Sequence, residues 1–252
     1  MPTPVDSTHA GQAVYTRRNL ALYDLIVLRL SNRGIWRCPT SRLLEHYARH
    51  LSANHLDVGV GTGFFLDRSR FPSHQPRLAL FDLNADSLSH TAARVKRLQP
   101  QTRQLDILAP IEAPPAPFDS IGVNYLLHCL PGPMTHKARA FDHLAPLLAP
   151  GATLFGATIL GDGVTRSSLA RRLMAFYNAK GIFSNEADTP QALERALAER
   201  FSHHQIEIVG CVALCSRPAR VIARQTQRHA RVSRSCCQRA DPAGRGSLKH
   251  QG

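Results

Sequence analysis

Apolar residues recur at three- and four-residue steps in two stretches near the start of the chain. Over residues 17–30 they include Leu20, Tyr23 and Ile26, which fall on one side of a helix of 3.6 residues per turn. A polar turn follows around Gly34, and Pro39 then opens a second apolar stripe that continues to Leu51. The pattern therefore predicts two amphipathic cap helices within residues 17–51.

From residue 55 the pattern changes to short apolar runs separated by helical stretches. The runs span residues 55–60, 78–82, 102–107, 119–124, 151–158 and 204–216, and the helical stretches span 64–70, 84–98, 134–148, 164–180 and 189–200. This alternation is typical of an α/β fold with a doubly wound, mainly parallel sheet. Gly210 divides the last run, which predicts an antiparallel edge hairpin and a seven-stranded sheet, although a glycine there also fits a bulge.

Length and charge place this fold in one domain with a basic extension. Of the 252 residues, 43% are hydrophobic, which fits a globular domain over residues 1–223 with its sheet core over 52–223. Residues 224–252 carry +6 of the net charge of +13, because seven basic side chains face a single acid there. That segment holds no aromatic residue on which bases could stack, so we expect a disordered, solvated tail and consider nucleic acid an improbable partner.

Targeting and metal-binding patterns are missing from the sequence. The first nine residues lack a basic start followed by an apolar run, and no stretch reaches about 18 apolar residues, so we expect a cytoplasmic protein without a membrane partner. The six cysteines form no C-x-x-C pair and lie beside no histidine at zinc-finger spacing. We therefore expect no bound metal and no disulfide framework.

A glycine-rich loop joins the first predicted strand of the sheet to the helix after it. Residues 57–63 read D-V-G-V-G-T-G, with glycines at 59, 61 and 63. A dinucleotide-binding loop would place its third glycine where this chain has Phe64. The carboxylate of Asp57 would repel a pyrophosphate, and it suits a cationic amino group instead. The loop therefore favours an adenosyl amino acid over a dinucleotide.

Further acids follow this loop in order, and together they carry a family resemblance. Asp82 ends the second strand about 20 residues after the glycines, and Asp106 follows the third. With the glycine loop and the turn at Pro150-Gly151, the chain resembles the class I S-adenosylmethionine-dependent methyltransferases of small-molecule type over about residues 50–160, and more loosely over 201–220. The resemblance implies a Rossmann-like methyltransferase fold with S-adenosylmethionine as cofactor.

The same resemblance assigns roles to individual residues. It implies that the glycines at 59, 61 and 63 cradle the cofactor and that Asp82 takes both ribose hydroxyls. Leu83 would flank the adenine, Asp106 would hold the exocyclic amine of the adenine, and Ile107 would be its apolar neighbour. Taken alone, Asp106 also fits a helix cap or a solvated loop acid.

The end of the fourth strand lies beside the methyl group in this family. It carries Asn124 and Tyr125, without the N-P-P-Y pattern that is common where the acceptor is a base amine or glutamine. This difference favours a small-molecule acceptor. Aromatic residues that could form its pocket, or could instead pack the cap helices onto the sheet, are Tyr15, Tyr23, Trp36, Tyr125 and Phe183.

His128 follows the fourth strand and is the candidate catalytic residue. Imidazole is the usual base near neutral pH, so His128 could take the proton of an acceptor hydroxyl or orient that group, or it could simply bond a loop carbonyl. We expect O-methylation of a secondary or aromatic metabolite. Two alternatives stay open, a nucleic-acid methyltransferase aided by the basic tail and a non-catalytic protein that binds S-adenosylmethionine. The oligomeric state stays open too, a homodimer included.

Overall fold

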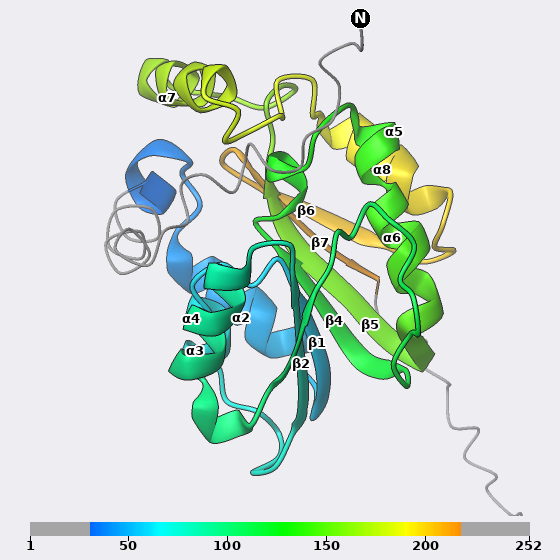
Figure 1. The fold of residues 1–252 in the computed structure, drawn as a ribbon. Helices are drawn as coiled ribbons and strands as arrows, with labels where there is room; N and C mark the ends of the chain where they lie inside the picture. The colour runs from blue at the N-terminus through cyan, green and yellow to red at the C-terminus, as the bar shows by residue number, and fades with distance from the viewer. Residues whose placement is uncertain (1–30, 218–252) are drawn as a thin grey trace, which may run out of the picture. The chain divides into compact units, whose positions relative to one another are not determined.

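The computed structural model describes residues 31–217, so the predicted helix over 17–30 and the basic tail over 224–252 lie outside the described residues. A seven-stranded sheet forms the centre, in the order β3-β2-β1-β4-β5-β7-β6 (Figure 1). The first five strands pair in parallel, and β7 runs antiparallel to both β5 and β6. The strands are β1 (Asn54–Val58), β2 (Arg77–Asp82), β3 (Gln101–Gln104), β4 (Phe118–Asn124), β5 (Leu148–Ile159), β6 (Gln205–Val209) and β7 (Val212–Arg217). The predicted doubly wound, mainly parallel sheet is confirmed.

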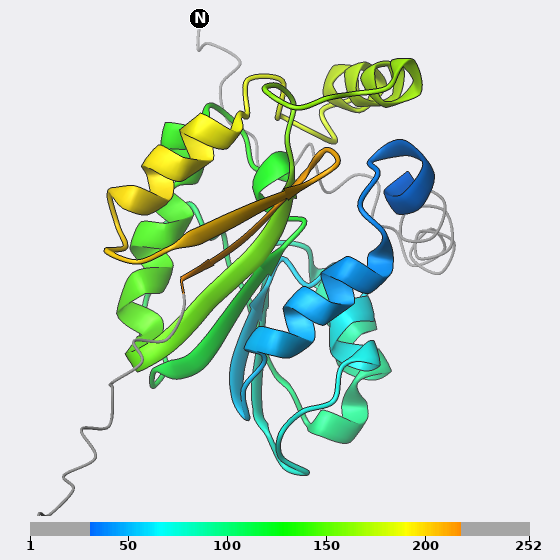
Figure 2. The same ribbon diagram turned by 180° about the vertical axis from the view of Figure 1, so that it is seen from behind.

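Helices cover both faces of this sheet (Figures 1 and 2). One face carries α2 (Thr40–His50), α3 (Phe64–Arg68) and α4 (Ala85–Arg94), and the other carries α5 (Met134–Lys137), α6 (Arg139–Leu144) and α8 (Pro190–Ala198). A further helix, α7 (Ser168–Ala179), follows the carboxyl end of β5. Each face has its own apolar core, because strands buried on both sides must be apolar on both sides.

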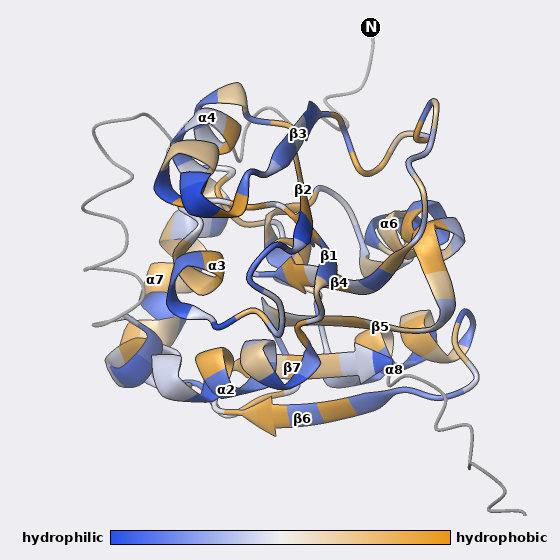
Figure 3. Ribbon diagram, turned by 90° about the horizontal axis from the view of Figure 1, so that it is seen from below, coloured by the Kyte–Doolittle hydropathy of each residue, from blue (hydrophilic) through white to orange (hydrophobic). Residues whose placement is uncertain are grey.

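The outermost strands form the hairpin that the sequence predicts. All but the last residue of β7 are buried, whereas β6 has exposed positions along its length, as an edge strand facing solvent requires (Figure 3). Gly210 lies in the turn with a φ of +61°, and a Cβ there would come within 2.3 Å of the Trp36 carbonyl oxygen. Only glycine fits this approach, so Gly210 makes the turn and no bulge is needed.

The long helix predicted over residues 134–148 differs from the structure. It is divided into α5 and α6, it passes into the 3-10 turn Ala145–Leu147, and β5 begins directly at Leu148. Pro146 lies in that turn, and proline has no N–H with which to continue a helix. Among residues 31–217, no helix is both long enough and apolar enough to span a bilayer.

Candidate active site

The glycine-rich loop runs from the end of β1 to the start of α3. A Cβ at Gly63 would lie 2.7 Å from the Thr91 Cγ2, so the loop can approach α4 only because this residue is glycine. Thr91 then donates a hydrogen bond to the carbonyl oxygen of Gly61 at 3.0 Å, and Arg94 donates to that of Thr62 at 3.1 Å. Two side chains of α4 therefore hold the loop in place.

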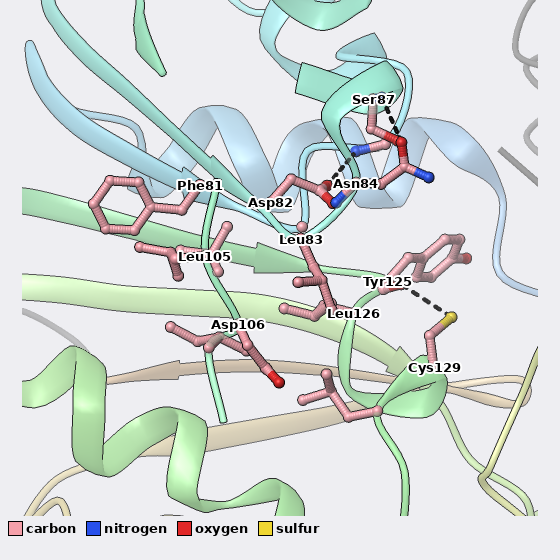
Figure 4. A pocket seen from close by; sticks show the side chains of 15 residues that line it. Phe81, Asp82, Leu83, Asn84, Ser87, Leu105, Asp106, Tyr125, Leu126 and Cys129 are labelled. Carbon is pink, nitrogen blue, oxygen red and sulfur yellow. Dashed lines mark hydrogen bonds between the residues drawn. The ribbon is translucent and has the colours of Figure 1, made fainter. Parts of the chain in front are cut away.

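The space in front of Gly61 is open. No atom lies within 4 Å of the position that its Cβ would occupy, and its φ of +52° also favours glycine. Two adjoining hollows meet at this loop, at the carboxyl ends of β1, β2 and β4 (Figure 4). The larger encloses about 710 Å³, including the solvent at its mouth. Nine residues that the sequence predicts as cofactor ligands line one or both hollows: Asp57, Gly59, Gly61, Gly63, Asp82, Leu83, Asp106, Ile107 and Asn124.

Two carboxylates lie on the larger hollow. Asp82 ends β2 and accepts hydrogen bonds from the backbone amides of Asn84 at 2.8 Å and Gly61 at 3.5 Å. Burial raises the pKa of Asp82, and these amides oppose the rise. Asp106 follows β3, and its Oδ1 accepts from the amide of Leu108 at 2.9 Å. Asp106 therefore both closes a local turn and lines the hollow, so the two roles weighed for it do not exclude each other.

The smaller hollow holds two buried polar side chains from neighbouring strands. Asp57 on β1 is 5% exposed, and its Oδ2 accepts a hydrogen bond from the Tyr47 hydroxyl at 3.0 Å. Asn124, at the end of β4, is 7% exposed, and its Nδ2 has no hydrogen-bond partner within residues 31–217. A buried amide donor without a partner is costly, so it points to a polar ligand as the missing partner.

Tyr125 follows Asn124 in a strained backbone conformation. Its φ is +56°, in the left-handed region that non-glycine residues rarely adopt. The ring is fixed by a hydrogen bond from its hydroxyl to Asn32 Oδ1 at 2.9 Å and by the edge of Phe65 at 6.5 Å. Tyr125 lines both hollows, so the strain places an aromatic ring at the point where they join.

Behind Tyr125 lies a cluster of rings that contains the other acceptor-side candidates. The His128 ring is 5.4 Å from that of Tyr125 and 4.6 Å from that of Phe183, and Phe183 is 6.1 Å from Trp36. None of His128, Phe183 and Trp36 lines the two hollows, and Trp36 is only 1% exposed. Tyr15 and Tyr23 lie outside the described residues. The structure thus brings together Tyr125, His128, Phe183 and Trp36, and among these four only Tyr125 lines the two hollows.

The protonation of His128 follows from its neighbours. Its Nδ1 accepts from the backbone amide of Ile159 at 3.4 Å, which leaves the proton of a neutral ring on Nε2. Burial lowers the pKa of His128 to about 3, and Lys137 adds to this effect. The imidazole is therefore neutral and presents a hydrogen-bond donor at Nε2.

Sequence reasoning missed several residues of this site. Tyr47 falls within the apolar stripe that runs from Pro39 to Leu51, and no local pattern pairs it with Asp57. Leu126 and Cys129 line the larger hollow, and no signal before the structure distinguished them from core residues. Within the described part of the chain, no group of three or more histidine, cysteine or acidic side chains is arranged to hold a metal ion.

Comparison with known proteins finds methyltransferases that are similar to this chain. The family model described as a methyltransferase domain matches residues 56–154. Demethylluteothin O-methyltransferase from Streptomyces thioluteus is 39% identical over 204 residues, which cover 81% of this chain and 89% of that protein. The physcion biosynthesis cluster O-methyltransferase from Aspergillus chevalieri is 35% identical and covers 81% of this chain and 93% of its own length.

Solved structures share the fold at much lower sequence identity. The structure of the DhpI–SAH complex superposes with a TM-score of 0.60 at 13% identity, covering 84% of this chain and 97% of that one. The sheet order, the glycine loop and the close relatives agree on one family. The chain therefore belongs to the class I methyltransferases, enzymes that use S-adenosylmethionine as the methyl donor.

Proposed function

We propose that this enzyme O-methylates a small, mostly aromatic metabolite whose hydroxyl ionises near neutral pH. The observation that carries the proposal is the strained Tyr125, whose ring lies where the two hollows join and packs against the ring of His128. Two relatives named as O-methyltransferases, one from a bacterium and one from a fungus, support the same kind of reaction.

The residues of the two hollows fit S-adenosylmethionine. The open space before Gly61 leaves room for a ligand against the backbone, and the unpartnered Nδ2 of Asn124 offers a donor to it. We assign the cationic amino group to Asp57, the ribose hydroxyls to Asp82 and the adenine amine to Asp106. Leu83 and Ile107 would then lie against the apolar faces of the adenine.

The bound cofactor supplies a methyl group on a positively charged sulfur, already activated for transfer to a nucleophile. The protein's own task is to align the acceptor oxygen and to exclude water. Tyr125, which lines both hollows, offers an aromatic surface for an acceptor ring. His128 carries its proton on Nε2, so we assign it the role of a donor that orients the acceptor oxygen. With a pKa near 3, it is a poor proton acceptor at neutral pH.

This assignment sets the kind of acceptor. If no strong base removes the proton, an acceptor that is already ionised reacts fastest, and a donor at Nε2 stabilises its negative oxygen. Acidic phenols and enols meet this condition, whereas simple alcohols do not. Over a series of substituted phenols, the transfer rate should therefore rise as the pKa of the acceptor hydroxyl falls toward the assay pH.

The test is a labelled-methyl transfer screen over phenols, enols, carboxylates, amines and RNA. We expect transfer to acidic hydroxyls in the wild type and none in Asp82→Ala, which should also lose the thermal stabilisation caused by cofactor binding. Saturating cofactor at 100 times Kd stabilises by about 2.7 kcal/mol, which a melting curve detects readily. Transfer only to amines or RNA would refute the proposal, and removal of residues 224–252 shows whether the tail takes part.

A further inference from the structure

A chain of buried hydrogen bonds runs beside β1 and ends at Asp57. The Tyr47 hydroxyl lies 3.0 Å from Asp57 Oδ2 and 3.0 Å from His55 Nε2. The other ring nitrogen of His55 lies 2.8 Å from the Ser120 Oγ, which in turn accepts from the backbone amide of Ser52 at 3.0 Å. Tyr47, His55 and Ser120 are all fully buried, so no solvent competes for these bonds.

An ionised Asp57 fixes the proton directions next to it in this chain. Tyr47 has one hydroxyl proton and gives it to the Asp57 carboxylate, so its oxygen must accept from His55 Nε2–H. The Nδ1 of His55 is then bare and faces the Ser120 hydroxyl, which also lies 2.7 Å from the Ser52 Oγ. Burial lowers the pKa of His55 to about 3 and raises that of Tyr47 well above its usual value, so both stay neutral. The Tyr47 and His55 donors thus point toward the Asp57 carboxylate.

Packing holds the chain in this arrangement. The Tyr47 ring stacks on Phe65 with the centroids 5.6 Å apart and the planes at 13°. Gly122 on β4 pairs in register with Asp57, and a Cβ at this position would lie 3.3 Å from both the Asp57 Oδ1 and the His55 Cε1. The glycine thus leaves room for the two polar side chains between the strands.

Within the described residues, the groups that set the charge of Asp57 are neutral or acidic. Burial raises the pKa of Asp57 to about 7, the Tyr47 hydrogen bond opposes the rise, and the nearby Asp82 adds to it. The titratable groups that face it are therefore Tyr47 from α2, His55 from β1 and Asp82 from β2. No lysine or arginine within residues 31–217 forms an ion pair with Asp57. An ionised Asp57 needs a cationic ligand, and it lines the hollow where one can bind.

We propose that Tyr47, His55 and Ser120 are positioning residues that orient Asp57 for the amino group of the cofactor and favour its ionised form, which cofactor binding completes by releasing a proton. The inference rests on the proposed function, because it takes Asp57 as the ligand of that amino group. It adds residues from α2, β1 and β4 that line neither hollow.

The test is the pH dependence of S-adenosylhomocysteine binding by titration calorimetry between pH 5.5 and 8. In the wild type we expect the affinity to be about tenfold lower at pH 6 than at pH 8, because a group of pKa about 7 must be ionised to bind. Calorimetry in buffers of different ionisation enthalpy should show a proton released at pH 6. Asp57→Asn should bind weakly at every pH and release no proton.

Tyr47→Phe is the decisive variant because it keeps the ring stacked on Phe65 and removes only the donor. Its midpoint should move upward by about one pH unit, since a bond that lowers the Asp57 pKa is gone, and its affinity at pH 7 should fall about fivefold. Ser120→Ala should shift the midpoint in the same direction by less, and it serves as the second variant if Tyr47→Phe is unstable.

The outcomes separate the two levels of the argument. A folded Tyr47→Phe or Ser120→Ala with the wild-type pH profile overturns the positioning role while cofactor binding stands. A wild-type affinity that does not change with pH overturns the proton release. Failure of the wild type to bind S-adenosylhomocysteine overturns the proposed function, and the inference with it.

Discussion

A buried ion pair anchors the loop that carries Phe183, and its removal gives the most direct test of the structure. Lys137 of α5 donates through Nζ to Asp188 Oδ2 and to the Ser184 carbonyl oxygen, both at 2.6 Å. The Lys137 and Asp188 side chains are 0% and 1% exposed. Burial raises the pKa of Asp188 and lowers that of Lys137, because desolvation outweighs their attraction for each group. In Lys137→Met the Asp188 carboxyl loses its only charged partner among the described residues.

The expected cost is large. Breaking a buried pair from one side destabilises a protein by about 3–5 kcal/mol, which lowers the melting temperature by about 6–20 °C for a domain of this size. The double variant Lys137→Met/Asp188→Leu should recover most of this loss, because an apolar pair needs no desolvation. Urea denaturation followed by circular dichroism, completed as a double-mutant cycle, measures both values.

The same variant should change function in a particular way. The amide of Ser184 donates to the His128 carbonyl oxygen at 2.8 Å, and the Phe183 ring lies against that of His128. A loosened loop should therefore raise the KM for the acceptor and leave the Kd for S-adenosylhomocysteine unchanged. A Lys137→Met enzyme within about 1 kcal/mol of wild-type stability would refute the reasoning, because a charge so buried cannot lose its partner at no cost.

Three further predictions follow from single contacts. Gly61→Val should abolish S-adenosylhomocysteine binding in calorimetry by filling the open space, with an unfolding free energy lowered by only about 1 kcal/mol. Gly156→Ala should destabilise by about 3 kcal/mol in urea, because its Cβ would lie 2.1 Å from the Val123 carbonyl oxygen; Gly34→Ala, with no atom within 4 Å, is the control that should stay near wild type. Below pH 6.5 the unfolded chain binds a proton at His128 that the folded chain does not, because burial lowers the pKa of His128 to about 3. His128→Asn should therefore reduce the loss of stability between pH 6.5 and pH 5 by about 1 kcal/mol per pH unit. An unchanged slope of stability against pH would show that His128 is protonated in the folded state.

The alternation of apolar runs and helical stretches was enough to predict the sheet, because each strand and helix is stabilised by its own local pattern. The order of Asp57, Asp82 and Asp106 predicted their common edge for a similar reason. Parallel strands bring their carboxyl ends to one side, so residues at equivalent points of successive strands must meet. The helix predicted over residues 134–148 was wrong at its C-terminal end, because Pro146 ends the helix although the apolar pattern continues.

Contacts between side chains of different helices and strands could not be predicted from the sequence. Tyr47 lies ten residues before Asp57, yet only the packing of α2 on the sheet turns its hydroxyl toward that carboxylate. Lys137 and Asp188 are 51 residues apart, and the first looks like an ordinary helix-surface lysine. His128 was predicted beside the transferred methyl as a base or an orienter, but the neighbours that leave its proton on Nε2 belong to β5.

The sequence by itself predicted the proposed cofactor side of this protein. That side is built from a loop, strand ends and glycines, whose geometry is local and is repeated by the βα units. Only the tertiary structure decided the acceptor side and the support of Asp57, because both depend on which side chains from distant elements share a buried space. Burial then sets their charge, as the neutral His128 and the raised pKa of Asp57 show. Desolvation is a property of the folded packing, and no residue carries it alone.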